Sequence, residues 1–161
     1  DEKGMLDLSN DYNALKVGSE NIFLKNRNAV CLRISNIFGK HYNSGTLLSD
    51  IITQVKSKKC KNVVLQNKNI LRDFLSIKDL CNLLFLCIKK KPKGIYNVGS
   101  GKGISGAGLA SKILRIMKVE KKIKTIESFF SKKVLDITKI QNRLSWKSNT
   151  KINKELKKIL I

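Results

Sequence analysis

A tyrosine and a lysine four positions apart, Tyr12 and Lys16, are the residues in this sequence best suited to proton transfer. On the helix predicted over residues 11–24, this spacing puts both side chains on one face, one turn apart. A phenol ordinarily has a pKa of about 10, and a neighbouring ammonium lowers that pKa by stabilising the phenolate. The pair is therefore suited to moving a proton to or from a hydroxyl group. Tyrosine and lysine often share this spacing by chance, so the pair indicates catalysis only together with the other motifs of the sequence.

Further motifs follow the pair along nearly the whole chain. They are Gly18 with Glu20, Leu32–Gly39, Leu71–Leu80, Ile95–Gly101, Leu135–Lys139 and Leu144–Trp146. In this order they resemble the extended short-chain dehydrogenase/reductase family, the NAD-dependent epimerases and dehydratases of nucleotide sugars. A series of motifs in order is far more specific than any one of them alone.

The resemblance implies a role for each matching position. Tyr12 is expected to be the catalytic base and acid, with Lys16 as the partner that lowers its pKa and holds the nicotinamide ribose. Ser35 is expected to lie near the nicotinamide of the NAD(P) cofactor, and Asn36 near the substrate phosphates. Arg72 is expected to clamp the nucleotide diphosphate, because a guanidinium makes bidentate contacts to phosphate oxygens.

Other interpretations of two of these features stay open. Arg72 is close in sequence to Asp73 and Asp79, and a surface ion pair with either is the alternative to a phosphate contact. The segment Gly101–Gly106 fits G-x-G-x-x-G after a strand, and Glu127 lies at a suitable distance for a ribose contact. Against a cofactor loop, the family has a glycine-rich turn here without a dinucleotide role, and Ser105 suits a helix N-cap.

Several family features are missing from the sequence. The glycine-rich dinucleotide loop and the Ser or Thr that assists the tyrosine both belong before Tyr12 in the family. The first residues, Asp1–Gly4, show neither an initiator Met nor an apolar signal segment, as in a chain without its preceding part or in a processed one. Many epimerases also have a second arginine before the Asp136 segment, where this chain has only Lys132 and Lys133. We therefore expect the 161 residues to be inactive alone.

The elements that would position these residues alternate between helix-like and strand-like patterns, which predicts an α/β fold. Predicted helices cover residues 11–24, 46–55, 79–88, 109–119, 136–144 and 151–160, and predicted strands cover 29–34, 62–65, 95–98 and 123–126. The resemblance implies a single C-terminal fragment, residues 1–161, of a Rossmann-like NAD(P)-binding fold plus a small substrate-binding domain. In it, about 1–35 and 62–98 would contribute to the Rossmann-like sheet, and strand 29–34 would be buried on both faces.

The chain carries a formal net charge of +21, a surface that can serve nucleic acid, an anionic membrane or phosphate-bearing substrates. Its lysines are spread along the whole length without interleaved aromatic residues, unlike sites that stack bases. The abundance of Lys, Asn and Ile matches the codon bias of an AT-rich genome. The longest apolar run, near Leu80–Ile88, is too short for a membrane span. We therefore expect neither a nucleic-acid nor a membrane partner.

The cysteines and the single histidine do not indicate a metal site. The cysteines, none in a C-x-x-C spacing, are Cys31, Cys60, Cys81 and Cys87. Scattered thiols favour a reduced, cytoplasmic compartment over a disulfide framework. Cys81 and Cys87 are expected in a helix core, His41 in an exposed loop, and Trp146 beneath the C-terminal helices.

These observations predict an enzyme that acts on a nucleotide sugar through Tyr12, Lys16 and NAD(P), as an epimerase or dehydratase and as a homodimer when complete. A nucleotide-4-keto-sugar reductase is an alternative, and the Leu135–Lys139 stretch also resembles epimerase-reductases of the GDP-fucose synthase type. An alternative of another class is a non-catalytic basic module that binds phosphate or nucleic acid.

Overall fold

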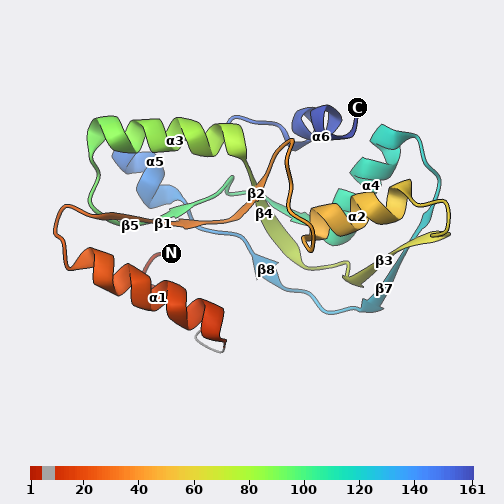
Figure 1. Ribbon diagram of the computed structural model, residues 1–161, viewed down its shortest axis with the longest axis horizontal. Helices are drawn as coiled ribbons and strands as arrows, with labels where there is room; N and C mark the ends of the chain where they lie inside the picture. Colours follow the sequence, from red (N-terminus) through yellow and green to blue (C-terminus); the bar gives the residue numbers. More distant parts are fainter. Residues whose placement is uncertain (5–9) are drawn as a thin grey trace.

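The computed structural model describes residues 1–4 and 10–161 as alternating helices and strands (Figure 1). The helices are α1 (Asp11–Leu24), α2 (Leu47–Lys56), α3 (Ile77–Lys90), α4 (Gly106–Met117), α5 (Thr138–Leu144) and α6 (Ile152–Leu160). The strands are β1 (Val30–Ile34), β2 (Asn36–Phe38), β3 (Asn62–Asn67), β4 (Leu71–Ser76), β5 (Gly94–Val98), β6 (Gly103–Ser105), β7 (Lys122–Glu127) and β8 (Lys132–Lys133). The fold class is α/β, as the sequence predicts.

Strand pairing divides the structure into three small sheets. Strands β1 and β5 pair in parallel, and Figure 1 shows them between α3 on one face and α1 on the other. Strand β4 lies at the centre, parallel to β2 and β8 and antiparallel to β6. Strands β3 and β7 form a third, parallel pair beside α2 and α4. Connections between parallel strands run through helices, as such pairs require.

The two segments expected to contribute to the Rossmann-like sheet, about 1–35 and 62–98, meet where β5 pairs with β1, whereas β3 pairs with β7. One sequence expectation about the strands needs correction. Strand β1 was expected to be buried on both faces, but its residues are half-buried and Ile34 is exposed. The reason is that neither face of β1 is tightly covered: α1 on one face has no buried residue, and on the other face a cavity of about 830 Å³ lies between Val30 and Leu32 and helix α3.

Strand β4 separates two hydrophobic cores. Successive strand side chains point to opposite faces, so Phe74 packs with α2, α4 and α6 whereas Leu75 packs with α3, α5 and β5. Trp146 is 5% exposed and belongs to the second core, beside Ile140 and Leu144 of α5, which confirms the predicted packing role. The same alternation turns Arg72 toward the Phe74 side of β4 and Asp73 toward the Leu75 side.

Local sequence signals explain where several helices begin. The Asn10 side chain accepts a hydrogen bond from the Asn13 amide and caps α1. Thr46 and Ser49 form a capping box at α2, and the Ser105 hydroxyl accepts from the Gly108 amide at α4, as predicted. These caps satisfy backbone groups that the first turn leaves unpaired.

A lysine closes the other end of α2. The Lys121 ammonium donates to the carbonyl oxygens of Gln54, Val55 and Ser57, at 2.7, 3.0 and 2.7 Å. The last carbonyls of a helix lack intrahelical partners and carry a partial negative charge, so an ammonium stabilises them. Lys121 therefore joins the start of the β7 segment to the end of α2.

The apolar stripe predicted on α1 is not covered. All residues of α1 are described, none of them is buried, and Leu15, Ile22 and Phe23 are each about two-thirds exposed. Of the two cysteines predicted in the core of α3, Cys87 is buried but Cys81 is exposed, because six positions place them on different sides of a helix. Among the described residues, no helix is long and apolar enough to cross a membrane.

Candidate functional site

A pocket of about 700 Å³ contains two of the predicted site residues, Asn36 and Arg72. It is lined by residues 36–43 and 45–48 together with Arg72, Phe74 and Ile77, and is called the arginine pocket below. The parallel pairing of β2 and β4 sets Asn36 opposite Phe74, which brings the two segments together. Phe38 and Phe74 contact edge to face, with ring centres 6.3 Å apart, and form an apolar wall.

Among residues 1–4 and 10–161, Arg72 makes no ion pair, contrary to the surface-pair alternative with Asp73 or Asp79. Its Nη1 atom is buried and has no hydrogen-bond partner among the described residues. Burial lowers the pKa of the Arg72 guanidinium, although an arginine this basic stays charged. The nearby carboxylates are used elsewhere, since Asp79 accepts from the Ser148 hydroxyl and the Thr150 amide, and Asp73 from the turn after β5. Arg72 thus presents a partly buried positive charge at the pocket, with no counter-ion among the described residues.

Asp73 fixes the glycine-rich turn that follows β5. Its carboxylate is fully buried and accepts from the Ser100 amide at 2.8 Å, the Ser100 hydroxyl at 2.5 Å and the Gly101 amide at 3.0 Å. A Cβ atom on Gly99 would collide with the Asp73 carboxylate, so only glycine fits there. The turn is therefore held against β4, one residue from Arg72.

Ser35 lies beside this turn, just beyond the end of β1. Its amide donates to the Val98 carbonyl at 2.8 Å, which extends the β1–β5 ladder by one residue. Its hydroxyl is buried and has no hydrogen-bond partner within residues 1–4 and 10–161, and a Cβ atom on Gly99 would lie 3.2 Å from it. Buried hydroxyls are normally hydrogen-bonded, so this one has the free capacity expected of a ligand contact.

Asn36 is only partly available to a ligand. Its side-chain amide donates to the Asp73 carbonyl at 2.8 Å, which ties β2 to β4. The amide nitrogen has a second hydrogen, and the side-chain oxygen accepts no hydrogen bond from another described side chain or backbone amide. Asn36 is exposed and lines the arginine pocket, so it joins the two strands and still faces the cavity.

Tyr12 and Lys16 lie together on α1, away from the residues that line the arginine pocket. The Lys16 ammonium is 5.5 Å from the centre of the Tyr12 ring, as the four-residue spacing predicts. Tyr12 is 68% exposed, and Lys16 is exposed as well. The site residues therefore form two groups, Tyr12 with Lys16 on α1 and Asn36 with Arg72 at the arginine pocket. Ser35 directly precedes Asn36 in the chain but does not line that pocket.

The sequence did not reveal the loop that follows β2 as part of the pocket. His41 is exposed, as expected, but together with Lys40 and Tyr42 it also lines the arginine pocket. Only the position of this loop after β2 could have indicated its role, because ligands in α/β folds bind outside the carboxyl ends of parallel strands. Lys40 and His41 add basic groups near Arg72.

The glycines of the Gly101–Gly106 segment are used for packing. A Cβ atom on Gly103 would meet Val134 and Leu71, and one on Gly101 would meet Ile137. Residues 103–105 form β6 and pair with β4 before α4 begins, so this segment is a strand and not an open loop at a helix start. The packing therefore argues against a dinucleotide loop there.

Comparison with known proteins assigns the chain to a family. The sequence model of the NAD dependent epimerase/dehydratase family matches residues 2–99, more than half of the chain. The chain belongs to the NAD dependent epimerase/dehydratase family. No curated protein matches the chain in sequence.

Solved structures agree with this family's fold. RMD from Pseudomonas aeruginosa, in complex with NADPH, has a TM-score of 0.88 and 18% identity, with 99% of this chain and 58% of that one covered. The dTDP-glucose 4,6-dehydratase from Bacillus anthracis, in complex with NAD, has a TM-score of 0.85 and 18% identity, with 99% and 54% covered.

A third similar structure is the UDP-glucose 4-epimerase from Bifidobacterium longum, in complex with NAD+ and UDP. It has a TM-score of 0.75 and 18% identity, with 94% of this chain and 53% of that chain covered. This chain thus spans little more than half the length of the structures that it resembles.

Proposed function

We propose that the chain is the substrate-binding and proton-transfer part of an NAD(P)-dependent enzyme acting on a nucleotide sugar, an epimerase or a dehydratase. The observation that carries this proposal is the Arg72 guanidinium, which lines the arginine pocket with one buried nitrogen and has no counter-ion in the part of the chain that the structure describes. A diphosphate supplies both the negative charge and the acceptor oxygens that this group lacks. Asn36, Lys40 and His41 surround the same cavity.

Tyr12 and Lys16 are the groups proposed for proton transfer. The Lys16 ammonium lies 5.5 Å from the centre of the Tyr12 ring, so the two groups stand together on one face of α1. The Tyr12 oxygen then takes the proton of a sugar hydroxyl as that carbon is oxidised, and returns a proton when the carbonyl is reduced. Epimerisation, dehydration and reduction of a keto sugar all use such a step, so the pair serves each of these outcomes.

The residues of this chain also fit one end of a nicotinamide cofactor. Such a cofactor supplies the hydride acceptor and donor when bound. The unpartnered Ser35 hydroxyl at the end of β1 has the free capacity to contact it, and Lys16 carries donors for a ribose. The Gly101–Gly106 segment does not supply the phosphate cradle of the cofactor, since its glycines are packed against neighbouring residues.

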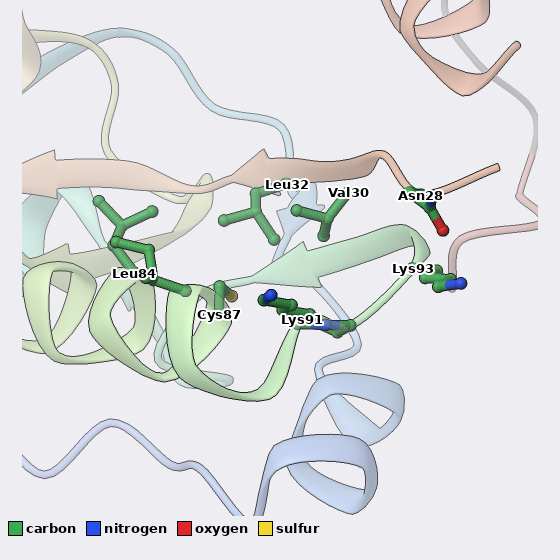
Figure 2. Close-up of a pocket in the computed structure, with 9 residues that line it drawn as sticks. Asn28, Val30, Leu32, Leu84, Cys87, Lys91 and Lys93 are labelled. Carbon is green, nitrogen blue, oxygen red and sulfur yellow. The ribbon is translucent and has the colours of Figure 1, made fainter. Parts of the chain in front are cut away.

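We propose that the dinucleotide-binding part lies outside these 161 residues and covers the open edge of β1. A cavity of about 830 Å³ lies at that edge, where Val30 and Leu32 of β1 face Leu84 and Cys87 of α3 (Figure 2). An open parallel strand beside apolar side chains is unusual, because parallel sheets are normally covered on both faces and continued at their edges. The lengths of the similar structures support this arrangement.

The test is calorimetric titration of the chain with nucleoside diphosphates and, separately, with NAD(H). We expect UDP, GDP or dTDP to bind, the matching monophosphate to bind at least about tenfold more weakly, and NAD(H) not to bind, because the phosphate contact lies in this chain and the dinucleotide cradle does not. Binding of DNA or RNA that falls steeply with salt, without any nucleoside diphosphate binding, would instead indicate the basic-module alternative. NAD(H) binding by the chain alone would contradict the proposed division.

A further inference from the structure

The helix that carries Tyr12 and Lys16 is attached to the sheet mainly through one ion pair. The Arg33 guanidinium donates to the Glu20 carboxylate through Nε at 2.9 Å and through Nη2 at 2.6 Å, a bidentate contact. The Arg33 and Glu20 side chains are only 20% and 12% exposed, so solvent screens the pair weakly. The hydrogen bonds to Glu20 also raise the pKa of the Arg33 guanidinium.

Other contacts make Arg33 the point where several segments meet. Its Nη1 atom donates to the Glu2 carbonyl at 3.0 Å, and the Glu2 carboxylate accepts from the Asn97 amide of β5 at 2.8 Å. In residues 1–4 and 10–161, the only other side-chain hydrogen bond between α1 and β1 is a long one, from the Cys31 thiol to the Glu20 carbonyl at 4.0 Å. Both contacts from β1 therefore reach α1 at Glu20.

Apolar packing does not replace this attachment. No residue of α1 is buried: Val17 and Leu24, on the side of Glu20, are only half-buried, and Leu15, Ile22 and Phe23 are each about two-thirds exposed. A helix whose apolar contact is limited to two half-buried side chains depends strongly on its few specific contacts for its position. The Glu20–Arg33 pair is thus the main feature that fixes where α1 lies along β1.

The pair also sets which residues of α1 and β1 are level with one another. Helix α1 and strand β1 run in opposite directions (Figure 1). Lys16 is four residues before Glu20, about 6 Å along the helix at 1.5 Å per residue. Ser35 is two residues after Arg33, about 6.6 Å along the strand at 3.3 Å per residue. Lys16 therefore lies level with Ser35, and both are on the face of β1 to which Arg33 points.

We propose that Glu20 and Arg33 are positioning residues, whose bidentate pair holds α1 in the register that sets Tyr12 and Lys16 beside the Ser35 end of β1. This inference rests on the proposed function for the importance of Tyr12 and Lys16, but the register itself does not depend on it. A pair that merely stabilised the fold would act on the whole chain, whereas a positioning pair acts on α1.

Hydrogen–deuterium exchange of the 161-residue chain separates these two roles. Arg33→Gln and Glu20→Gln each remove the bidentate ion pair. We therefore expect the α1 amides to exchange at least about tenfold faster, while the exchange rates of the α4 amides stay unchanged. The double variant Glu20→Arg with Arg33→Glu recreates an ion pair and should restore most of the α1 protection. Arg27→Gln, at an exposed arginine just after α1, is the matched control and should change nothing.

Several outcomes would overturn the proposal. Unchanged amide exchange of α1 in both single variants would show that the Glu20–Arg33 pair does not hold the helix. Equal acceleration in α1 and α4, or a swapped pair no better than the single variants, would indicate a general stabilising role. In the complete enzyme, Arg33→Gln should lower kcat and leave KM for the nucleotide sugar within about twofold, since the arginine pocket is untouched. If the chain bound no nucleoside diphosphate, the proposed function would fail, while the exchange result would still decide the register.

Discussion

Replacing Arg72 by methionine should make the ligand-free chain more stable and the ligand-bound chain less stable. An unpaired buried donor costs about 1–3 kcal/mol. Because only Nη1 is buried without a partner, the lower end applies, so Arg72→Met should raise the free energy of unfolding by about 1 kcal/mol. For a chain of this length, that change raises Tm by about 2–4 °C. Methionine keeps most of the side-chain volume, so the pocket wall should remain intact.

A bound nucleoside diphosphate should reverse this order of stability and make the unsubstituted chain more stable than Arg72→Met. At a ligand concentration of 100 times Kd, binding stabilises the unsubstituted chain by about 2.7 kcal/mol. Loss of a partly buried charge contact costs about 2–5 kcal/mol of affinity, so at the same concentration the ligand should stabilise the variant by less than about 1 kcal/mol. Thermal unfolding with and without UDP, GDP or dTDP measures both effects in one experiment.

Arg115→Met, at an exposed arginine of α4, is the matched control and should shift Tm little in either condition. The reasoning would be refuted if Arg72→Met destabilised the ligand-free chain by 2 kcal/mol or more, about the cost of a core truncation. It would equally be refuted if the ligand stabilised both forms alike, because Arg72 would then make no contact with the diphosphate.

Two further predictions concern stability and thiol reactivity. Lys121→Met leaves the last carbonyls of α2 without their donor, so it should lower the free energy of unfolding in urea by about 2–3 kcal/mol. Lys124→Met, at an exposed site of β7, is the control and should lower it little. Equal losses in the two variants would contradict the capping role of Lys121. Iodoacetamide should modify the exposed Cys81 quickly and Cys87 only on unfolding, as mass spectrometry can follow. Burial raises the pKa of the Cys87 thiol, so at pH 8 the folded chain has less thiolate at Cys87 than the unfolded chain. Equal labelling rates of Cys81 and Cys87 in the folded chain would contradict this prediction.

The sequence predicted the helices well because their signals are local. The predicted limits of α1, residues 11–24, agree with the structure, where Asn10 caps the helix and Asp11 begins it. Strand β4 was not predicted, since Arg72 and Asp73 interrupt its apolar pattern. It forms because it pairs with β2, β6 and β8, and because the turn at Ser100 and Gly101 satisfies the buried Asp73. Such pairing over long sequence distances overrides local pattern.

The candidate site was predicted residue by residue but not as an arrangement. The family resemblance singled out Asn36 and Arg72 separately, and the parallel register between β2 and β4 brings them to one pocket. Neither the roles of His41 and Lys40 at that pocket nor the pairing of Glu20 with Arg33 could be found from sequence spacing. A loop between two elements has no periodicity, and an ion pair thirteen residues apart depends on how a helix folds back on a strand.

The open edge of β1 also bears on how copies of the chain behave toward one another. Unpaired strand edges are templates for intermolecular β-pairing, and this one is flanked by apolar side chains. The net charge of +21 opposes such contact through mutual repulsion, which acts over about 10 Å at 0.1 M salt and over about 3 Å at 1 M. The scattered lysines therefore give the chain a colloidal protection that depends on ionic strength, whatever part they take in binding a ligand.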